Sequence, residues 1–291
     1  MPPPLRISTR NARFQQWQAL LGNRTKRQRA GEFLVHGVRP ISLALRFDWA
    51  LTALLYDADR DLSTWARDVL STAIAGDPVR AALTTELMAE LGEKDEGAPE
   101  LIAVATLPPD SLQRLARGGG APSGSTLGVV FDRPTGPGNI GTLIRSADAF
   151  GAHGVVVTGH AADPYDPRSV RASAGSLFAV PVVRVPSHRE VLAWRDTMAP
   201  TDRPQLVATD ERGDIDAADA DLTGPTYVVI GNETSGLSAS WRDACDLTVR
   251  IPMTGSASSL NAASAATVVL YEAARQRTAA ERRPTFEREL G

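Results

Sequence analysis

The chain has 291 residues, enough for about two domains if each takes roughly 150 residues. Its composition, 43 % hydrophobic and 22 % charged, is that of an ordinary folded protein, and no apolar run approaches the roughly 20 residues that span a bilayer. The single cysteine, Cys245, excludes an intramolecular disulfide framework, and the four histidines show no metal-ligand spacing. The opening residues lack the apolar core of a secretory signal. We therefore expect a cytoplasmic, metal-independent protein without a membrane segment.

The net charge of -3 hides an uneven distribution along the chain. The first 31 residues carry seven basic side chains and no acidic one, whereas the remainder carries 24 basic and 34 acidic side chains. The seven are Arg6, Arg10, Arg13, Arg24, Lys26, Arg27 and Arg29. Such a run of like charge often marks an arm that binds nucleic acid, although a solvated tail is the alternative. We interpret residues 1–30 as a basic helical arm.

The first half of the chain begins with helical spacing over residues 8–23, where Ser8 or Thr9 is the candidate N-cap and Gly22 the stop. Strand-like and helical segments then alternate. Strands are expected at Glu32–His36, Leu51–Tyr56, Val79–Leu83 and Leu101–Thr106, and helices from Pro40, at Leu62–Ala75 and at Thr85–Leu91. This alternation predicts a small α/β domain over residues 31–106.

Residues 107–125 are rich in Pro, Gly and Ser, so we expect a linker there. A second alternation of short apolar strands and helices follows. Its strands are expected at Leu127–Phe131, Gly154–Thr158, Val180–Val185, Gln205–Thr209, Tyr227–Ile230 and Thr248–Ile251. The pattern indicates a mostly parallel sheet covered on both faces, in a domain of residues 126–280 with a tail at 281–291.

Three glycine-containing loops follow three of these strands, and such loops are the usual ligand site of an open α/β sheet. The first loop contains G-x-G-x-x-G at Gly136, Gly138 and Gly141, a pattern typical of dinucleotide-binding turns. Four residues separate the strand from the first glycine, and Pro137 lacks the N–H that would face a pyrophosphate. A dinucleotide site therefore fits this loop poorly.

The helix after the first loop is expected over Thr142–Phe150, with Asn139 as its candidate cap. Arg145 lies off the apolar stripe of that helix, so its guanidinium can project into the crevice. Alternatively, Arg145 pairs on the surface with Asp148, one turn further on.

The second and third loops carry polar residues next to glycines and small side chains. In the second, Gly231–Ser238, Glu233 can accept a hydrogen bond from a substrate or an arginine, or form a capping box with Ser238. The third, Ile251–Ala266, leads into a helix built of Ala and Ser, whose small side chains allow close approach of a ligand or another subunit.

Taken together, the three loops resemble the SpoU/TrmH family of the SPOUT superfamily of RNA methyltransferases. The motifs are Asn139-x-Gly141-x-x-x-Arg145, Ile230-Gly231-Asn232-Glu233 with Gly236, and Ile251-Pro252-Met253 followed by Ser259-Leu260-Asn261. The first domain is similar to the substrate-binding domain often fused to this family, although His36 stands where many relatives carry Glu.

Two further segments, Arg10–Asn23 and Gly159–Asp163, resemble a subgroup that methylates a uridine 2′-hydroxyl of 23S rRNA and confers resistance to orthosomycin (avilamycin-type) antibiotics. The resemblance implies an α/β fold: a C-terminal SPOUT domain with a deep trefoil knot and a smaller, RNA-binding-like N-terminal α/β domain. It also implies a homodimer, S-adenosylmethionine (SAM) as cofactor, and 23S rRNA bound through the N-terminal domain and the basic arm. A tRNA 2′-O-methyltransferase and a non-catalytic RNA-binding or ribosome-assembly protein are the alternatives.

The resemblance also assigns site residues. The implied cofactor-binding positions are Thr209, Ile230, Gly231, Ile251, Met253 and Leu260. The implied catalytic positions are Arg145, Asn139, Glu233, Ser259 and Asn261. Because a guanidinium with a pKa above about 12 is a poor base at pH 7, we expect Arg145 to stabilise negative charge on the 2′-oxygen and to hold the adjacent phosphate. The proton would leave to water or to the phosphate.

Overall fold

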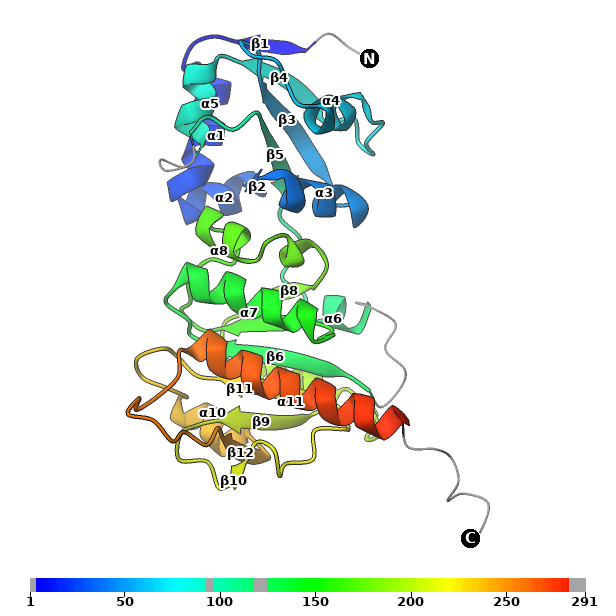
Figure 1. The fold of residues 1–291 in the computed structure, drawn as a ribbon, viewed down its shortest axis with the longest axis vertical. Helices are drawn as coiled ribbons and strands as arrows, with labels where there is room; N and C mark the ends of the chain where they lie inside the picture. Colours follow the sequence, from blue (N-terminus) through cyan, green and yellow to red (C-terminus); the bar gives the residue numbers. More distant parts are fainter. Residues whose placement is uncertain (1–3, 93–96, 118–124, 283–291) are drawn as a thin grey trace. The chain divides into compact units, whose positions relative to one another are not determined.

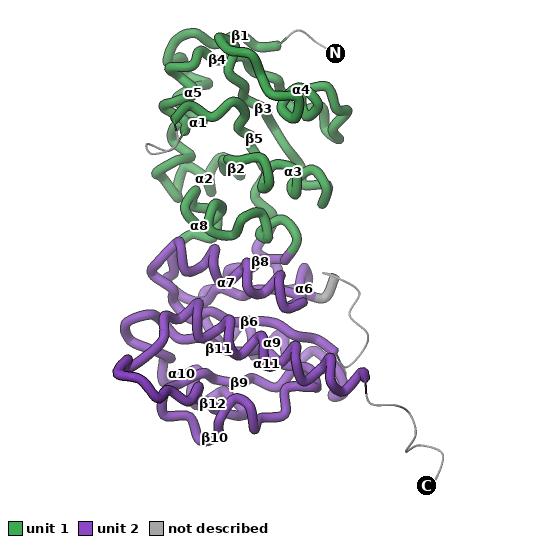
Figure 2. The backbone as a smooth tube through the Cα atoms, viewed as in Figure 1, with its two compact units in different colours: residues 1–109, 163–179 green, residues 110–162, 180–291 purple. Residues whose placement is uncertain are grey.

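The computed structural model describes residues 4–92, 97–117 and 125–282. The chain forms two compact units, one of residues 1–109 with 163–179 and one of residues 110–162 with 180–291 (Figure 2). Each unit is built on its own β-sheet (Figure 1). No helix in these described ranges has the length and hydropathy to cross a membrane.

The first unit contains a five-stranded sheet in the order β1-β4-β3-β5-β2. Its strands are β1 (Leu5–Ile7), β2 (Glu32–His36), β3 (Leu51–Asp57), β4 (Val79–Leu83) and β5 (Leu101–Thr106). Strands β1, β4 and β3 run parallel, whereas β5 is antiparallel to both β3 and β2. The four predicted strands are confirmed. Strand β1 was not predicted, because three residues are too short to show a hydrophobic period.

The helical elements of the first unit are α1 (Ala12–Gly22), α2 (Arg24–Ala30), α3 (Val38–Arg46), α4 (Thr64–Ser71), α5 (Thr85–Leu91), α8 (Pro167–Ala172) and the short 3₁₀ helix η1 (Ser176–Phe178). The predicted N-cap of the first helix, Ser8 or Thr9, is wrong. Asn11 caps α1, and its side chain accepts a hydrogen bond from the Phe14 N–H at 3.0 Å. The preceding residues are taken by β1 and its turn, which moves the helix start to Ala12.

Residues 4–30, expected as an arm, lie within the first unit in this structure. Strand β1 pairs with β4, and Phe14, Trp17 and Leu20 of α1 are buried in the core of that unit. The apolar face of α1 explains this packing, since it buries three large side chains against the sheet.

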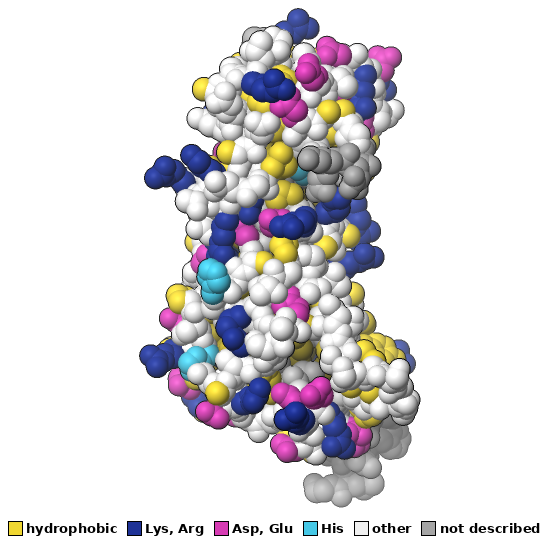
Figure 3. Space-filling model, turned by 90° about the vertical axis from the view of Figure 1, so that its left-hand side faces the viewer, with side chains coloured by type: hydrophobic (Ala, Val, Ile, Leu, Met, Phe, Trp, Pro, Cys, Tyr) yellow, Lys and Arg dark blue, Asp and Glu magenta, His cyan; other side chains and the backbone are white. Residues whose placement is uncertain are grey.

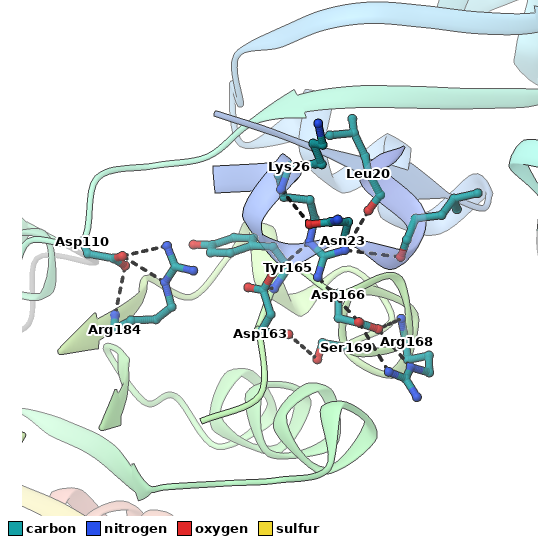
Figure 4. Close-up of polar contacts among 12 residues, drawn as sticks. Leu20, Asn23, Lys26, Asp110, Asp163, Tyr165, Asp166, Arg168, Ser169 and Arg184 are labelled. Atoms are coloured by element: carbon teal, nitrogen blue, oxygen red, sulfur yellow. Dashed lines mark hydrogen bonds and ion pairs between the residues drawn. The ribbon is translucent and has the colours of Figure 1, made fainter. Parts of the chain in front are cut away.

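The first unit also includes residues 163–179, which lie between two strands of the other unit in the sequence. Arg27 of α2 is buried; its Nε lies 2.8 Å from Oδ2 of Asp163 and its Nη1 donates to the Leu20 carbonyl at 2.7 Å. Asp166 lies 3.6 Å from the same guanidinium. Figure 4 shows Asp163 and Asp166 with these contacts as dashed lines, and Asp166 also pairs with Arg168.

The second unit contains a seven-stranded sheet in the order β10-β12-β9-β11-β6-β7-β8, and every neighbouring pair is parallel. Its strands are β6 (Leu127–Asp132), β7 (Val155–Thr158), β8 (Val182–Val185), β9 (Gln205–Thr209), β10 (Ile215–Asp216), β11 (Thr226–Ile230) and β12 (Leu247–Arg250). Strands β6 and β11 are buried along their whole length, as their continuous apolar runs predict. The prediction of a parallel sheet is confirmed.

The helices of the second unit are α6 (Gln113–Arg117), α7 (Pro137–Ala149), α9 (His188–Asp196), α10 (Ala239–Ala244) and α11 (Ala262–Arg282). Helix α7 begins five residues before the predicted Thr142, with Pro137 in its first turn. Proline is favoured there because the N–H groups of the first turn have no acceptor within the helix, so the absence of an N–H in proline costs no hydrogen bond.

The predicted linker, residues 107–125, is not a linker over its whole length. The two units divide after Pro109, and Leu112 and Leu115 are buried in the core of the second unit. Arg184 pairs with Asp110 at 2.7 Å, which fastens the start of this stretch to the second unit. Residues 118–124, and residues 283–291 of the predicted tail, lie outside the described residues.

Candidate functional site

A cavity of about 630 Å³ lies at the carboxyl ends of β9, β11 and β12. These strands are parallel and in the order β12-β9-β11, so the loops that follow them share one edge of the sheet. The volume falls within the usual range of small-molecule sites. All six predicted cofactor-binding residues line this cavity: Thr209, Ile230, Gly231, Ile251, Met253 and Leu260.

The loop after β11, residues 231–238, forms one wall of the cavity. It is a tight turn, because Asn232 and Gly236 exchange two backbone hydrogen bonds of 3.0 Å each. A Cβ atom at Gly231 would overlap the backbone of Gly236 and Leu237. Only glycine therefore fits at position 231, where the backbone passes close to the backbone of Gly236 and Leu237.

Glu233 lies in that loop, and its carboxylate binds the start of α7. Its Oε1 accepts hydrogen bonds from the Gly136 N–H at 3.1 Å and from Nδ2 of Asn139 at 2.9 Å. Its Oε2 accepts from the Thr135 N–H at 3.0 Å. The predicted role of Asn139 as a helix cap is wrong, since Asn139 lies inside α7 and a carboxylate from another loop binds the N–H groups at that end.

The charge state of Glu233 follows from these contacts. Partial burial is the largest single influence and raises the pKa of Glu233, but the hydrogen bonds from Asn139, Thr135 and Gly136 together outweigh it. The pKa therefore lies below its ordinary value, and the carboxylate is ionised at neutral pH.

The alternative of a capping box with Ser238 is wrong, because the Ser238 N–H donates to Asp132 instead.

Asn139 connects Glu233 to the third loop. Nδ2 of Asn261 donates to Oδ1 of Asn139 at 3.1 Å, and Oδ1 of Asn261 accepts from the Ala263 N–H at the start of α11. Three predicted catalytic positions, Glu233, Asn139 and Asn261, are thus joined in one chain of hydrogen bonds. Of these three, only Glu233 lines the cavity, and Ser259, a fourth predicted catalytic position, lines it as well.

Arg145 lies outside the cavity wall as well. Its side chain is exposed on α7, and it forms no hydrogen bond or ion pair within the described ranges of the chain. The alternative interpretation of Arg145 as the surface partner of Asp148 is therefore wrong. The five donors of this guanidinium are available to an incoming group.

The hydroxyl of Thr209 is a buried polar atom in the cavity wall. Its Oγ1 has no hydrogen-bond partner among the residues described. A buried hydroxyl without a partner is costly, so this atom is suited to a ligand that supplies a donor or an acceptor.

Several charged residues that sequence reasoning did not select also line the cavity: Asp210, Glu211, Arg212, Asp214 and Arg242. The first four directly follow β9, and their position after a strand of the parallel sheet is the signal that could have identified them. In the described part of the chain, no group of His, Cys, Asp and Glu is arranged to hold a metal ion.

The structure also bears on the dinucleotide alternative. Gly138 and Gly141 lie inside α7, and the Gly136 N–H is bound by Glu233. The G-x-G-x-x-G pattern therefore does not form a loop whose N–H groups could bind a pyrophosphate, and the dinucleotide interpretation is wrong.

Comparisons with known proteins agree with this arrangement. Residues 126–271 match the SpoU rRNA Methylase family, and residues 11–103 match the SpoU L30e-like domain. Over 277 residues the chain is 59 % identical to the 23S rRNA (uridine(2479)-2′-O)-methyltransferase of Streptomyces viridochromogenes, covering 95 % of this chain and 94 % of that protein.

Two solved structures share the fold. The SpoU methyltransferase AviRb from Streptomyces viridochromogenes, in complex with AdoMet, has a TM-score of 0.85 at 59 % identity, over 92 % of this chain and 99 % of that chain. The AdoMet-bound rRNA methyltransferase from Sinorhizobium meliloti has a TM-score of 0.80 at 27 % identity, over 93 % and 97 % of the two chains. The chain belongs to the SpoU rRNA methylase family.

Proposed function

We propose that this chain transfers the methyl group of SAM to the 2′-hydroxyl of a uridine in 23S rRNA. The similarity to a methyltransferase of that description extends over nearly the whole chain. One observation carries the proposal: the cavity at the ends of β9, β11 and β12 is lined by all six predicted cofactor-binding residues.

The residues of the cavity fit SAM. Ile230 and Ile251 provide apolar walls, and the buried Thr209 hydroxyl offers a hydrogen bond that the chain leaves unused. Met253 and Leu260 are 37 % and 40 % exposed, and a ligand seated against them would cover this apolar surface. When bound, SAM supplies an electrophilic methyl group on its sulfonium.

The chain's own residues position the ribose and stabilise charge. The exposed guanidinium of Arg145 stabilises the negative charge that develops on the 2′-oxygen and holds the neighbouring phosphate. Ser259 offers a hydroxyl to the ribose from the cavity wall. The proton leaves to water or to the phosphate, because the pKa of a guanidinium is too high for Arg145 to accept it.

Glu233, Asn139 and Asn261 act by positioning. The Glu233 carboxylate is ionised, and hydrogen bonds from Thr135, Gly136 and Asn139 occupy it, so it is a weak candidate for a base. Its contacts fix the start of α7 relative to the second loop, and Asn139 extends the connection to Asn261. This network sets the place from which α7 presents Arg145.

The first unit binds the RNA. It matches the SpoU L30e-like domain, and the basic segment of residues 6–29 is folded onto it. Lys26 and Arg29 of α2 are exposed, which suits contact with phosphates. On the face drawn in Figure 3, Lys and Arg side chains are spread over the surface with Asp and Glu side chains among them.

The assembly is a homodimer of knotted catalytic domains. The outer face of α11 exposes Val268 and Tyr271, at 40 % and 55 %, and Phe150 packs edge-on against Tyr271 at 5.8 Å. An apolar face of this kind next to α7 supports a subunit interface there.

The trefoil knot follows from the family resemblance. Action on 23S rRNA places the protein in the cytoplasm, and modification of that RNA supports a role in orthosomycin resistance.

A transfer assay with tritiated SAM and unmodified ribosomal RNA tests the function. We expect tritium in 23S rRNA, with the modified position revealed by reverse-transcription stops at low dNTP concentration. Incorporation into tRNA alone would favour the tRNA alternative. Binding of RNA without incorporation into any RNA would favour a non-catalytic protein, and either result would contradict the proposal.

A further inference from the structure

Two adjacent residues at the end of β6, Asp132 and Arg133, make contacts that neither the family motifs nor the proposed chemistry uses. The Asp132 side chain is 5 % exposed. Its Oδ1 accepts a hydrogen bond from Oγ1 of Thr158 at 3.1 Å, and its Oδ2 accepts from the Ser238 N–H and from Nε of Arg133, each at 3.1 Å. A nearly buried carboxylate thus binds the end of β7 on one side and the end of the 231–238 loop on the other.

Arg133 has an unusual backbone conformation. Its φ of 53° lies in the left-handed region, which costs energy for a residue other than glycine. Gly159 lies beside it, and a Cβ atom at Gly159 would come within 2.7 Å of Cγ of Arg133. The chain therefore holds Arg133 in a strained conformation and leaves room for its side chain.

This conformation directs both ends of Arg133 toward the same loop. Its carbonyl oxygen accepts from Nδ2 of Asn232 at 2.7 Å, and its Nη2 donates to the Gly236 carbonyl at 3.3 Å. Together with the bond from Ser238 to Asp132, these contacts bind the 231–238 loop at its beginning, at its turn and at its end.

The loop so held is a wall of the cavity, which Gly231, Glu233 and Leu237 all line. Asp132 and Arg133 do not line it themselves. Their effect on a ligand must therefore pass through the loop.

We propose that Asp132 and Arg133 are positioning residues for the cofactor cavity, which hold the 231–238 loop in the form that binds the methyl donor. The proposal rests on the assignment of SAM to this cavity. It predicts that substitutions at the two residues weaken SAM binding by more than their effect on stability explains. The reason is that the strained φ of Arg133 accompanies its contacts with the 231–238 loop.

The substitution Arg133→Gly separates positioning from stability. Glycine adopts a positive φ without strain, which offsets part of the stability lost with the ion pair to Asp132. The melting temperature should therefore fall only slightly, whereas the contact with the Gly236 carbonyl is lost. We expect the Kd for SAM, measured by calorimetry on the full chain, to rise about tenfold. The matched control is Asp48→Gly, which makes the same backbone change at a φ of 52° on an exposed residue of the first unit. Its Kd for SAM should equal that of the wild type.

A second pair of variants tests Asp132. Asp132→Ala removes both acceptors, and we expect the KM for SAM to rise about tenfold while kcat at saturating SAM and the KM for RNA stay within about threefold. In Asp132→Asn the remaining carbonyl oxygen can still accept from Ser238, so most of the SAM affinity should return.

Three results would overturn the inference: a wild-type Kd for SAM in Arg133→Gly, an equal loss of affinity in Asp48→Gly, or a fall in kcat without a change in the KM for SAM. A wild-type chain that fails to bind SAM would instead contradict the proposed function, so the two failures can be told apart.

Discussion

Arg27 in the first unit and Arg145 in the second show how differently one residue type is used in this protein. Arg27 is 2 % exposed and donates to carboxylates and backbone carbonyls of its own unit. Arg145 is exposed and donates to none of the described residues. A guanidinium whose donors are used inside the fold contributes to stability, whereas one with unused donors is available to a polyanionic substrate. The predictions below test that distinction, beginning with the largest effect.

Arg27→Met should be the most damaging change. It leaves the carboxylates of Asp163 and Asp166 next to an apolar side chain, and removing one partner of a buried ion pair typically costs about 3–5 kcal/mol. Chemical denaturation monitored on the full chain measures the loss. The matched control is Arg168→Ala, because Arg168 pairs with the same Asp166 but its side chain is 70 % exposed; its cost should stay below about 1 kcal/mol. Equal stabilities for the two variants would show that the burial of Arg27 does not add to the stability of the first unit.

Arg145→Ala should leave the fold intact and abolish most of the activity. Loss of a donor that stabilises developing charge typically lowers kcat by about 10²–10³-fold. We expect unchanged melting and an unchanged Kd for SAM, with the loss confined to methyl transfer and RNA affinity. Arg145→Lys keeps the charge but loses the bidentate geometry, so it should recover only part of the activity. Full activity in the alanine variant would refute the assigned role.

Glu233→Gln should have a smaller effect that depends on pH. An amide replaces one acceptor oxygen by a donor, which would face the N–H of Thr135 or Gly136 just before α7 and cost about 1 kcal/mol at neutral pH. The pKa of Glu233 lies below its ordinary value of 4.5, so its contribution to stability is present above that value and is lost as the pH falls below it. The difference in melting temperature between wild type and variant should therefore shrink on acidification toward pH 4. A constant difference would mean that the carboxylate is not responsible.

Thr209→Val should have opposite effects on stability and on binding. Replacing a buried hydroxyl that has no partner by a methyl group should leave the SAM-free chain equally or more stable. If the hydroxyl binds the cofactor, the Kd for SAM should rise about fivefold, which calorimetry can resolve. An unchanged Kd would mean that Thr209 only lines the cavity.

Much of the fold could be predicted because its signals are local. The strands of the second unit are short apolar runs, and parallel strands place the loops that follow β9, β11 and β12 at one edge. The six implied cofactor-binding positions came from the family resemblance, and their places at or after the ends of these strands explain why all six line one cavity. Pro137 was also a local signal for the start of α7, and it could have corrected the predicted boundary.

The remaining features depend on pairs of residues far apart in the sequence. Arg27 and Asp163 are separated by 136 residues, and Gly136 and Glu233 by 97. No hydrophobic period or capping rule encodes such a pair, so residues 163–179 could not be assigned to the first unit, nor Glu233 to the start of α7. The contacts of Asp132 and Arg133 with the 231–238 loop could not be predicted for the same reason.

A calorimetric titration of SAM into the chain of 291 residues tests the central claim most directly. The cavity at the ends of the three strands should bind one molecule per chain, and prior addition of SAM should raise the melting temperature. Absence of both heat and stabilisation, at concentrations that saturate a known methyltransferase of this family, would contradict the account of the site.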